Sequence, residues 1–238
     1  MNKQIFRDIL FLDIETVAQY STFEQVPVRF QHLWQKKSSF FKEASEKSVA
    51  ELYEKAGIYA EFGKIIVIAV GYFVEKGDDL ELRIKGLANH EEKALLEEFK
   101  EILTHFDTKH LKLCAHNGKE FDFPYLSRRM LVHNIELPEV LDQAGKKPWE
   151  VPHIDTMELW KFGDYKHFTS LDLLAALFDI ETSKDDIDGS MVNQVYYKEK
   201  NLSRINKYCK NDIRVLAQVY LHLIQAYKTQ ITKTIFLE

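Results

Sequence analysis

The segment IFRDILFLDIET (residues 5–16) decides the fold, because it reads as a buried central strand that ends in acidic residues. Nearly every position from Ile5 to Ile14 is apolar, so a strand here would be covered on both faces. Side chains two positions apart on a strand point the same way and lie about 7 Å apart. Asp13 and Glu15 would therefore project together from the strand end, where two carboxylates could share a divalent cation.

The pattern downstream of this segment predicts a mixed sheet with helices on its faces. We expect further strands at 64–73, 80–84, 111–115 and 152–155, and helices at 89–106, 123–132, 171–178 and 202–228. Residues 18–62 do not fit this alternation and read as a helical insertion, and residues 137–152 read as a loop.

Composition limits the class of protein. The 238 residues are 45% hydrophobic, which excludes disorder and fits one large domain with an insertion. The longest apolar stretch, residues 65–74, is about half of what a bilayer requires. Asp8 stands where a signal peptide would be apolar, and two cysteines cannot form a disulfide framework. We expect a cytoplasmic protein that has no membrane partner.

Asp-x-Glu triplets are common, and this chain has three. They are Asp13/Glu15, Asp79/Glu81 and Asp179/Glu181, and residues 179–182 repeat the tetrapeptide of residues 13–16. The second pair lies at a predicted hairpin, where charges are ordinary solvated edge residues. The third follows a predicted helix and reads as a helix exit. Only the first pair ends a buried strand, where uncompensated carboxylates would be costly.

A second acidic position follows the strand at 111–115. The segment NGKEFDFPYL (residues 117–126) begins with an Asn-Gly turn, and Pro124 suits the first turn of the next helix. Asp122 alone would be an ordinary helix-start carboxylate. Its interest comes from the motif around it.

A third acidic position lies on the C-terminal helix. Tyr208 and Asp212 are four residues apart and share one helix face. At 100° per residue, Asp212 falls near the centre of an apolar stripe that includes Cys209. A carboxylate there must be paired, protonated or bound to a metal.

Taken together, these three motifs resemble those of the DEDD superfamily, the ribonuclease H-like, DnaQ-like 3′-5′ exonucleases. The middle motif is most similar to that of the proofreading domains of family B DNA polymerases. One branch has a histidine five residues before the last aspartate, where this chain has Lys207. The other has a tyrosine four residues before it, as Tyr208 is here, so the chain resembles the DEDDy branch.

The resemblance covers residues 1–17 and 63–238. It implies an α/β fold with a ribonuclease H-like, mixed five-stranded sheet flanked by helices. The helical insertion, residues 18–62, would follow the first strand within a single exonuclease domain spanning residues 1–238.

The resemblance also implies a metal-dependent exonuclease that releases nucleoside 5′-monophosphates. Two divalent cations, Mg²⁺ or Mn²⁺, would lie about 4 Å apart. Asp13 would bridge them, Glu15 and Asp212 would complete one site, and Asp122 would hold the second. Tyr208 would orient the attacking water, because a phenol with a pKa near 10 is a poor base at neutral pH.

Substrate contacts are expected from Thr16 at the terminal nucleotide, Asn117 near a phosphate or sugar, and Phe121 or Phe123 against a base. Core packing is the alternative for both phenylalanines, and Asp155 reads as a helix cap. Arg29, Lys36 and Lys37 of the insertion are hypothesised to form part of a strand-binding wall. The formal net charge of -5 gives no global positive field for nucleic acid.

The expected partner is the 3′ end of a single-stranded nucleic acid, with a polymerase or repair protein as a further partner if the chain does not act alone. DNA is favoured by the family B resemblance, and RNA is the close alternative, because no motif reports a 2′-hydroxyl contact. A catalytically silent nucleic-acid-binding module would require a damaged metal ligand, and all four are intact. A transposase-like or integrase-like enzyme would need a different acidic spacing and a basic surface.

Overall fold

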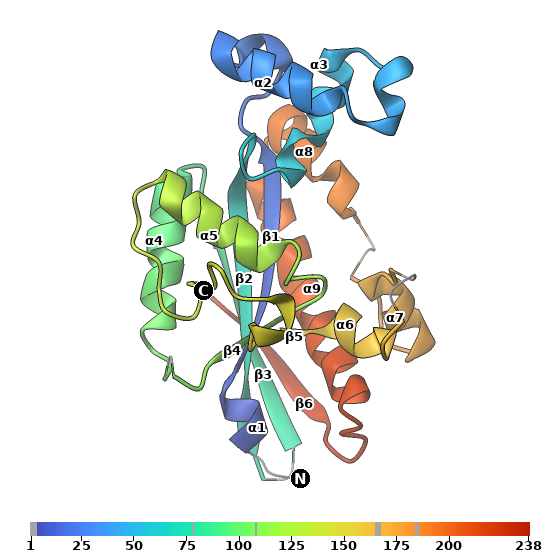
Figure 1. Ribbon diagram of the computed structural model, residues 1–238. Helices are drawn as coiled ribbons and strands as arrows, with labels where there is room; N and C mark the ends of the chain where they lie inside the picture. Colours follow the sequence, from blue (N-terminus) through green and yellow to red (C-terminus); the bar gives the residue numbers. More distant parts are fainter. Residues whose placement is uncertain (1–3, 78, 108, 165–167, 184–185) are drawn as a thin grey trace.

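A mixed sheet runs through the centre of the computed structural model, in which six strands are formed by the described residues, 4–77, 79–107, 109–164, 168–183 and 186–238 (Figure 1). The strands lie in the order β5-β4-β1-β2-β3-β6. Their bounds are β1 Ile9–Ala18, β2 Gly63–Lys76, β3 Asp79–Ala88, β4 Lys112–Ala115, β5 Ile154–Asp155 and β6 Ile231–Leu237. Since β1 is antiparallel to β2 and parallel to β4, the sheet is mixed, as the sequence predicts.

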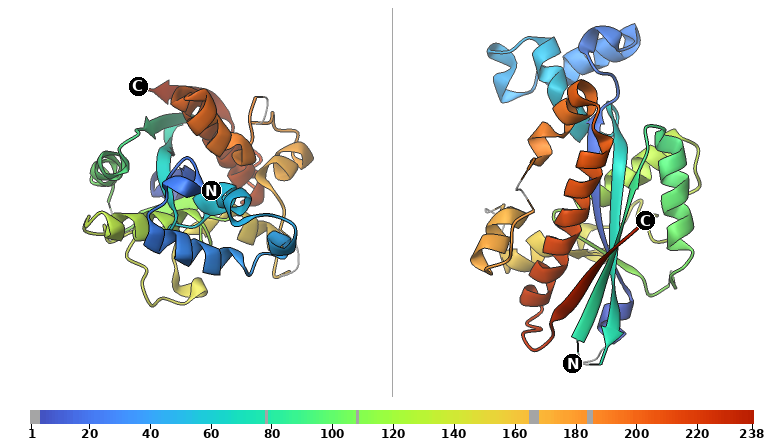
Figure 2. Two further views of the ribbon diagram at one scale, coloured as in Figure 1. Left: turned by 90° about the horizontal axis from the view of Figure 1, so that it is seen from above. Right: turned by 180° about the vertical axis from the view of Figure 1, so that it is seen from behind.

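Helices cover both faces of the sheet (Figure 2). α9 packs on one face, and α4 and α5 pack on the other. The helices are α1 Gln4–Arg7, α2 Val28–Ser38, α3 Val49–Leu52, α4 Glu92–Leu103, α5 Asp122–Val132, α6 Thr156–Lys161, α7 Leu171–Leu177, α8 Val192–Gln194 and α9 Leu202–Leu223. Short 3₁₀ turns lie at Phe23–Gln25, Lys42–Ser45, Tyr53–Ile58, Pro148–Glu150 and Gly189–Met191, and a π-helical turn spans Val195–Glu199.

β1 is apolar on both faces because both helical layers pack against it. Ile9 and Phe11 belong to the hydrophobic cluster under α9, whereas Leu10 and Leu12 belong to the cluster under α4 and α5. All four side chains are almost completely buried. The strand therefore lies in the middle of the molecule, and any polar group at its end must find a partner there.

The prediction of five strands is wrong, because β6 adds a sixth. β6 pairs in parallel with β3, which the sequence places at the sheet edge. The segment ITKTIFL is rich in β-branched and aromatic residues, which favour a strand, a signal that the prediction does not use. One consequence concerns Glu81, expected to be solvated: it is buried, and its carboxylate pairs with Arg83.

Two element ends also differ from the prediction. The first strand begins at Ile9 rather than Ile5, because the segment before it forms the turn of α1. α9 ends at Leu223 rather than near Lys228, because Gln225 adopts a left-handed conformation with a φ of 58°. In the part of the chain described here, no helix is both long and apolar enough to cross a bilayer.

Residues 18–62, called the insertion below, are helical as predicted. They contain α2, α3 and three of the 3₁₀ turns, and they project beyond the end of the sheet (Figure 1). The insertion has its own hydrophobic cluster around Trp34, whose side chain is completely buried and whose Nε1 donates to the carbonyl of Val49. It is therefore a packed body rather than a loop.

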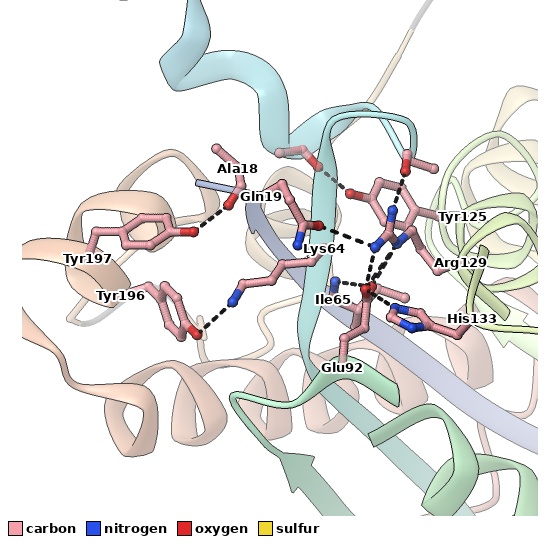
Figure 3. Close-up of polar contacts among 12 residues, drawn as sticks. Ala18, Gln19, Lys64, Ile65, Glu92, Tyr125, Arg129, His133, Tyr196 and Tyr197 are labelled. Carbon is pink, nitrogen blue, oxygen red and sulfur yellow. Dashed lines mark hydrogen bonds and ion pairs between the residues drawn. The ribbon is translucent and has the colours of Figure 1, made fainter. Parts of the chain in front are cut away.

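A buried ion-pair network joins α4, α5, β2 and the base of the insertion (Figure 3). Arg129 Nε donates to Glu92 at 2.9 Å, and its Nη1 donates to the carbonyl of Ala60 at 2.9 Å. The same carboxylate accepts from the Ile65 amide at 2.7 Å and bonds His133 Nε2 at 2.7 Å. Because every oxygen of Glu92 has a partner, this buried charge is compensated.

We predict that Arg129→Met destabilises the fold strongly, since it leaves the Glu92 carboxylate buried without its cation. The expected loss is roughly 3–5 kcal/mol in the free energy of unfolding, measured by urea titration. The neighbouring Arg128 is exposed, so Arg128→Met should stay within about 0.5 kcal/mol of the wild type. Equal urea midpoints for the two variants would contradict the assigned role of the network.

His153 holds the loop before β5 against the sheet edge. Its Nδ1 accepts from the Leu113 amide at 3.3 Å, and its Nε2 donates to the carbonyl of Val140 at 2.8 Å. A second proton would have to sit on Nδ1, which faces an amide donor. Burial lowers the pKa of His153 to about 4.

Because of His153, the free energy of unfolding should decrease as the pH falls. Below the ordinary pKa of histidine, His153 binds a proton in the unfolded chain but not in the folded one. The contribution of His153 to the free energy of unfolding is therefore complete above pH 7 and declines toward pH 4. The expected decline is about 3 kcal/mol over that window. It is measured as the difference in unfolding free energy between the wild type and His153→Gln at each pH. The exposed His105, replaced in the same way, is the control; a difference that does not change with pH would refute the prediction.

Candidate metal centre

The acidic end of β1 faces α9. Residues at odd positions of β1, such as Phe11 and Val17, pack in the cluster under α9, so Asp13 and Glu15 lie on that same face. Glu15 is buried and Asp13 is partly exposed. The pairing of β1 with β2 shifts register between Glu15 and Thr16, a bulge that re-aims the side chains at the strand end.

α9 presents Tyr208, Cys209 and Asp212 to this strand end. All three side chains are buried, as the apolar stripe of the helix predicts. The Cys209 thiol donates to Asp13 Oδ2 with a distance of 3.1 Å between sulfur and oxygen. The Tyr208 hydroxyl is hydrogen-bonded to the Asp212 carboxylate. α9 and β1 therefore meet through polar groups in the middle of an apolar interface.

Asp122 joins the same cluster from the first turn of α5. Its side chain is buried, and its Oδ1 accepts from the Ile14 amide at 3.1 Å. This bond fastens the start of α5 to the backbone between Asp13 and Glu15. Carboxylates from three distant segments are thus assembled at one place.

The electrostatics confirm that these carboxylates are close. Burial, then repulsion by Asp212 and Asp122, raises the pKa of Asp13 well above its ordinary value. Burial and repulsion by Asp13 do the same for Glu15. Burial raises the pKa of Asp122 to about 7, against the bond from Ile14. Each group therefore resists ionisation in the presence of the others.

This donor set fits a divalent metal. In the part of the chain that the structure describes, no lysine or arginine pairs with Asp13, Glu15 or Asp122. A ligand atom from each of Asp13, Glu15 and Cys209 can be chosen so that all lie within 4.8 Å of one another. Oxygen ligands with uncompensated negative charge are those that Mg²⁺ and Mn²⁺ prefer.

Asp155 organises the loop that leads into α5. It caps α6, as predicted, by accepting from the Met157 amide at 2.9 Å. The same carboxylate accepts from the amides of Asn117 at 2.9 Å and Lys119 at 3.1 Å. Between these residues Gly118 is required, because a Cβ there would lie 2.4 Å from Ala115.

The three predicted substrate-contact residues lie around the carboxylate cluster, and their roles stay predictions. Thr16, at the bulge of β1, is half-buried and hydrogen-bonded to Tyr125. Asn117 adopts the left-handed conformation with a φ of 63°. Phe121 is half-buried and packs against the Tyr125 ring with centroids 5.4 Å apart. Phe123 is 3% exposed and belongs to the core, so packing is its role.

Cys209 and the loop-holding bonds of Asp155 were not predicted. Cys209 had one sequence signal, its place on the stripe that carries Asp212. The other Asp-x-Glu triplets lie elsewhere, as the sequence predicts. Asp179 follows α7 in a left-handed conformation, and Glu181 pairs with Arg214 at 3.2 Å.

Comparison with known proteins gives a family match and matches to solved structures. The profile of a family described as predicted 3′-5′ exonucleases related to the exonuclease domain of PolB matches residues 58–237. A solved structure, the family B DNA polymerase from the hyperthermophilic archaeon Pyrobaculum calidifontis, matches 91% of this chain with a TM-score of 0.55 and 15% identity. The match covers 24% of the polymerase chain, and at this identity the likeness concerns the fold. No curated protein gives a significant sequence match.

We predict that Asp13→Asn raises the melting temperature of the metal-free protein, because it removes one charge from a set of repelling carboxylates and keeps the side-chain shape. The expected gain is roughly 1–2 kcal/mol, or a few degrees at this chain length. Mg²⁺ or Mn²⁺ should stabilise the wild type in a thermal-shift titration and should lose most of this effect in the variant.

Asp179→Asn is the matched control. It lies in the same tetrapeptide, Asp-Ile-Glu-Thr, and asparagine tolerates its φ of 55°. It should change neither the melting temperature nor the metal response. If both variants respond to metal as the wild type does, the cluster at β1 is not the metal centre.

Proposed function

The chain belongs to the family of predicted 3′-5′ exonucleases related to the exonuclease domain of PolB, and on this basis we propose that it hydrolyses phosphodiester bonds at the 3′ ends of single-stranded nucleic acid, with DNA favoured. The observation that carries the proposal is the assembly of four acidic side chains from β1, α5 and α9 around one buried corner. The ribonuclease H-like sheet and the resemblance to polymerase exonuclease domains agree with it.

Asp13, Glu15, Asp122 and Asp212 would hold two divalent cations, Mg²⁺ or Mn²⁺. Bound there, such ions lower the pKa of a water and stabilise negative charge on the leaving oxygen. The thiol of Cys209 and the amide of Ile14 orient the carboxylates of Asp13 and Asp122 from the protein side. These contacts hold the side chains in place before any ligand arrives.

Tyr208 would position the attacking water rather than remove its proton. Burial and the neighbouring Asp212 raise the pKa of its phenol above the ordinary value, so it stays protonated at neutral pH. Its one hydroxyl proton is donated to the Asp212 carboxylate, so it cannot act as a base, and its oxygen is left to accept a hydrogen bond from a water. A phenol fixed on α9 next to the carboxylates is suited to orienting the attacking water.

The nucleotide at the 3′ end would lie against Thr16, Asn117 and Phe121. The loop that carries Asn117 is held by Asp155, and Phe121 is braced by Tyr125, so both positions are rigid. We propose that residues 1–238 form a single exonuclease domain. RNA remains the alternative substrate, and a polymerase or repair protein is proposed as the partner where the chain does not act alone.

The proposal is tested with 5′-labelled single-stranded DNA and an RNA of the same sequence, each incubated with Mg²⁺ or Mn²⁺. We expect a ladder that shortens from the 3′ end and is absent with Asp13→Ala/Asp212→Ala. Tyr208→Phe should lower kcat roughly 10- to 1000-fold, since one positioned hydrogen bond is lost, and should keep the metal-induced thermal shift.

The strand that is cleaved faster, DNA or RNA, shows whether the enzyme prefers deoxyribose or ribose. No cleavage of either strand with either metal would refute a nuclease and favour a silent binding module. Loss of the metal response in Tyr208→Phe would instead mean that this residue supports the metal centre rather than the water.

A further inference from the structure

The proposed reaction assigns no role to the surface of the insertion. The family profile begins at residue 58, so α2 and α3 lie outside it. The carboxylate cluster is built without them, from β1, α5 and α9. The insertion is nevertheless well packed: Trp34 is completely buried, and its ring contacts Tyr53 and Phe62 with centroids 5.5 Å and 5.1 Å apart. Its surface is therefore a fixed one.

The base of the insertion is fastened to α5, the helix that begins at Asp122 (Figure 3). Tyr125 donates to the carbonyl of Gly57 at 2.8 Å, and Arg129 donates to that of Ala60 at 2.9 Å. The Gln19 amide donates to the carbonyl of Phe62 at 2.8 Å. Ala18 lies five positions after Asp13 on β1, so the insertion starts about 16 Å from Asp13.

α2 is basic in an acidic chain. Its residues VRFQHLWQKKS include Arg29, His32, Lys36 and Lys37 and no aspartate or glutamate. Among the described residues, Arg29 and Lys36 form no ion pair, and both are exposed. Lys37 lies over the Tyr59 ring, 4.4 Å from its centroid. Within α2 itself, these positive charges have no acidic counterpart.

The charges of α2 gather on the side away from its packing face. At 100° per residue, Arg29, Leu33 and Lys36 lie within one sector, opposite the buried Trp34 and Ser38. Arg29 and Lys36 are seven residues apart, which is about 10 Å along the helix. Leu33 between them is 47% exposed, and the neighbouring Phe30 is 44% exposed.

We propose that this face of α2, formed by Arg29, Leu33 and Lys36, binds the sugar-phosphate backbone of the single-stranded substrate upstream of its 3′ end. The inference rests on the proposed function. Charge complementarity selects a polyanion, and cations interleaved with apolar side chains are typical of surfaces that bind single strands. Since α2 lies beyond Ala18, a strand must span more than about 16 Å from Asp13 to contact α2, which requires several nucleotides (Figure 1).

A bilayer fits this face less well. A helix that lies in a membrane surface inserts a continuous apolar stripe, and the apolar side of α2 is already filled by Trp34. The insertion would thus make the enzyme sensitive to substrate length, with long strands held at two places and very short ones at the metal centre alone.

The test reverses two charges. Arg29→Glu/Lys36→Glu is compared with Lys228→Glu/Lys233→Glu, which changes the net charge equally at exposed positions around β6. Both pairs are placed in Asp13→Ala/Asp212→Ala protein, so that binding is measured without cleavage. Fluorescence anisotropy is recorded with 5′-fluorescein oligothymidylates of about 20 and about 4 nucleotides over a range of salt concentrations.

We expect the α2 variant to lose at least tenfold in affinity for the long strand and much less for the short one. Its slope of log K against log salt should fall by about 1.4, the value for two lost phosphate contacts. The control should bind both strands as the unreversed protein does. An equal loss of affinity in the control, or no loss in the α2 variant, overturns the proposal. The face of α2 would then have to bind another polyanion or a protein.

These outcomes are separable from failure of the proposed function. If the chain with intact carboxylates cuts nothing but the α2 variant still binds the long strand less tightly, only the nuclease activity is refuted. If the chain cuts both strands and the α2 variant keeps its preference for the long one, only the role of α2 is refuted.

Discussion

The carboxylates at the end of β1 repel one another, and much of the surrounding structure serves to hold them in spite of this. Asp13 and Glu15 lie on a strand whose remaining side chains are packed on both faces, so the strand cannot bend away. Asp212 is carried by a helix that the same hydrophobic cluster presses against the strand. The free energy of apolar burial therefore offsets the electrostatic cost of the cluster.

Directed hydrogen bonds then fix each acidic side chain. The Ile14 amide holds Asp122, and the Cys209 thiol holds Asp13. The carboxylate of Asp155 fixes the loop before α5 through the amides of Asn117 and Lys119, and joins it to the start of α6 through the amide of Met157. A group held in this way keeps its position when its charge state changes, which is what a metal centre requires of its ligands.

The network of Glu92 and Arg129 has a different task. Its charges are opposite and compensate one another, so the network stabilises the fold without any bound ligand. It links α4, α5 and β2 to the carbonyl of Ala60 at the base of the insertion (Figure 3). The helix α5 thus contacts both the carboxylate cluster, through Asp122, and the base of the insertion, through Arg129.

The sequence by itself determined the central strand, the turn at Asn117 and the acidic position inside the apolar stripe of α9. Each of these is a local pattern, in which periodicity or turn chemistry over a few residues already restricts the backbone. The tertiary structure alone decided that β6 pairs with β3, that Arg129 is buried against Glu92, and that Cys209 contacts Asp13. An arginine on a helix or a cysteine in an apolar stripe carries no local sign of its partner. Such partners are chosen by contacts between residues far apart in the chain, and those contacts exist only once the sheet and its two helical layers have packed together.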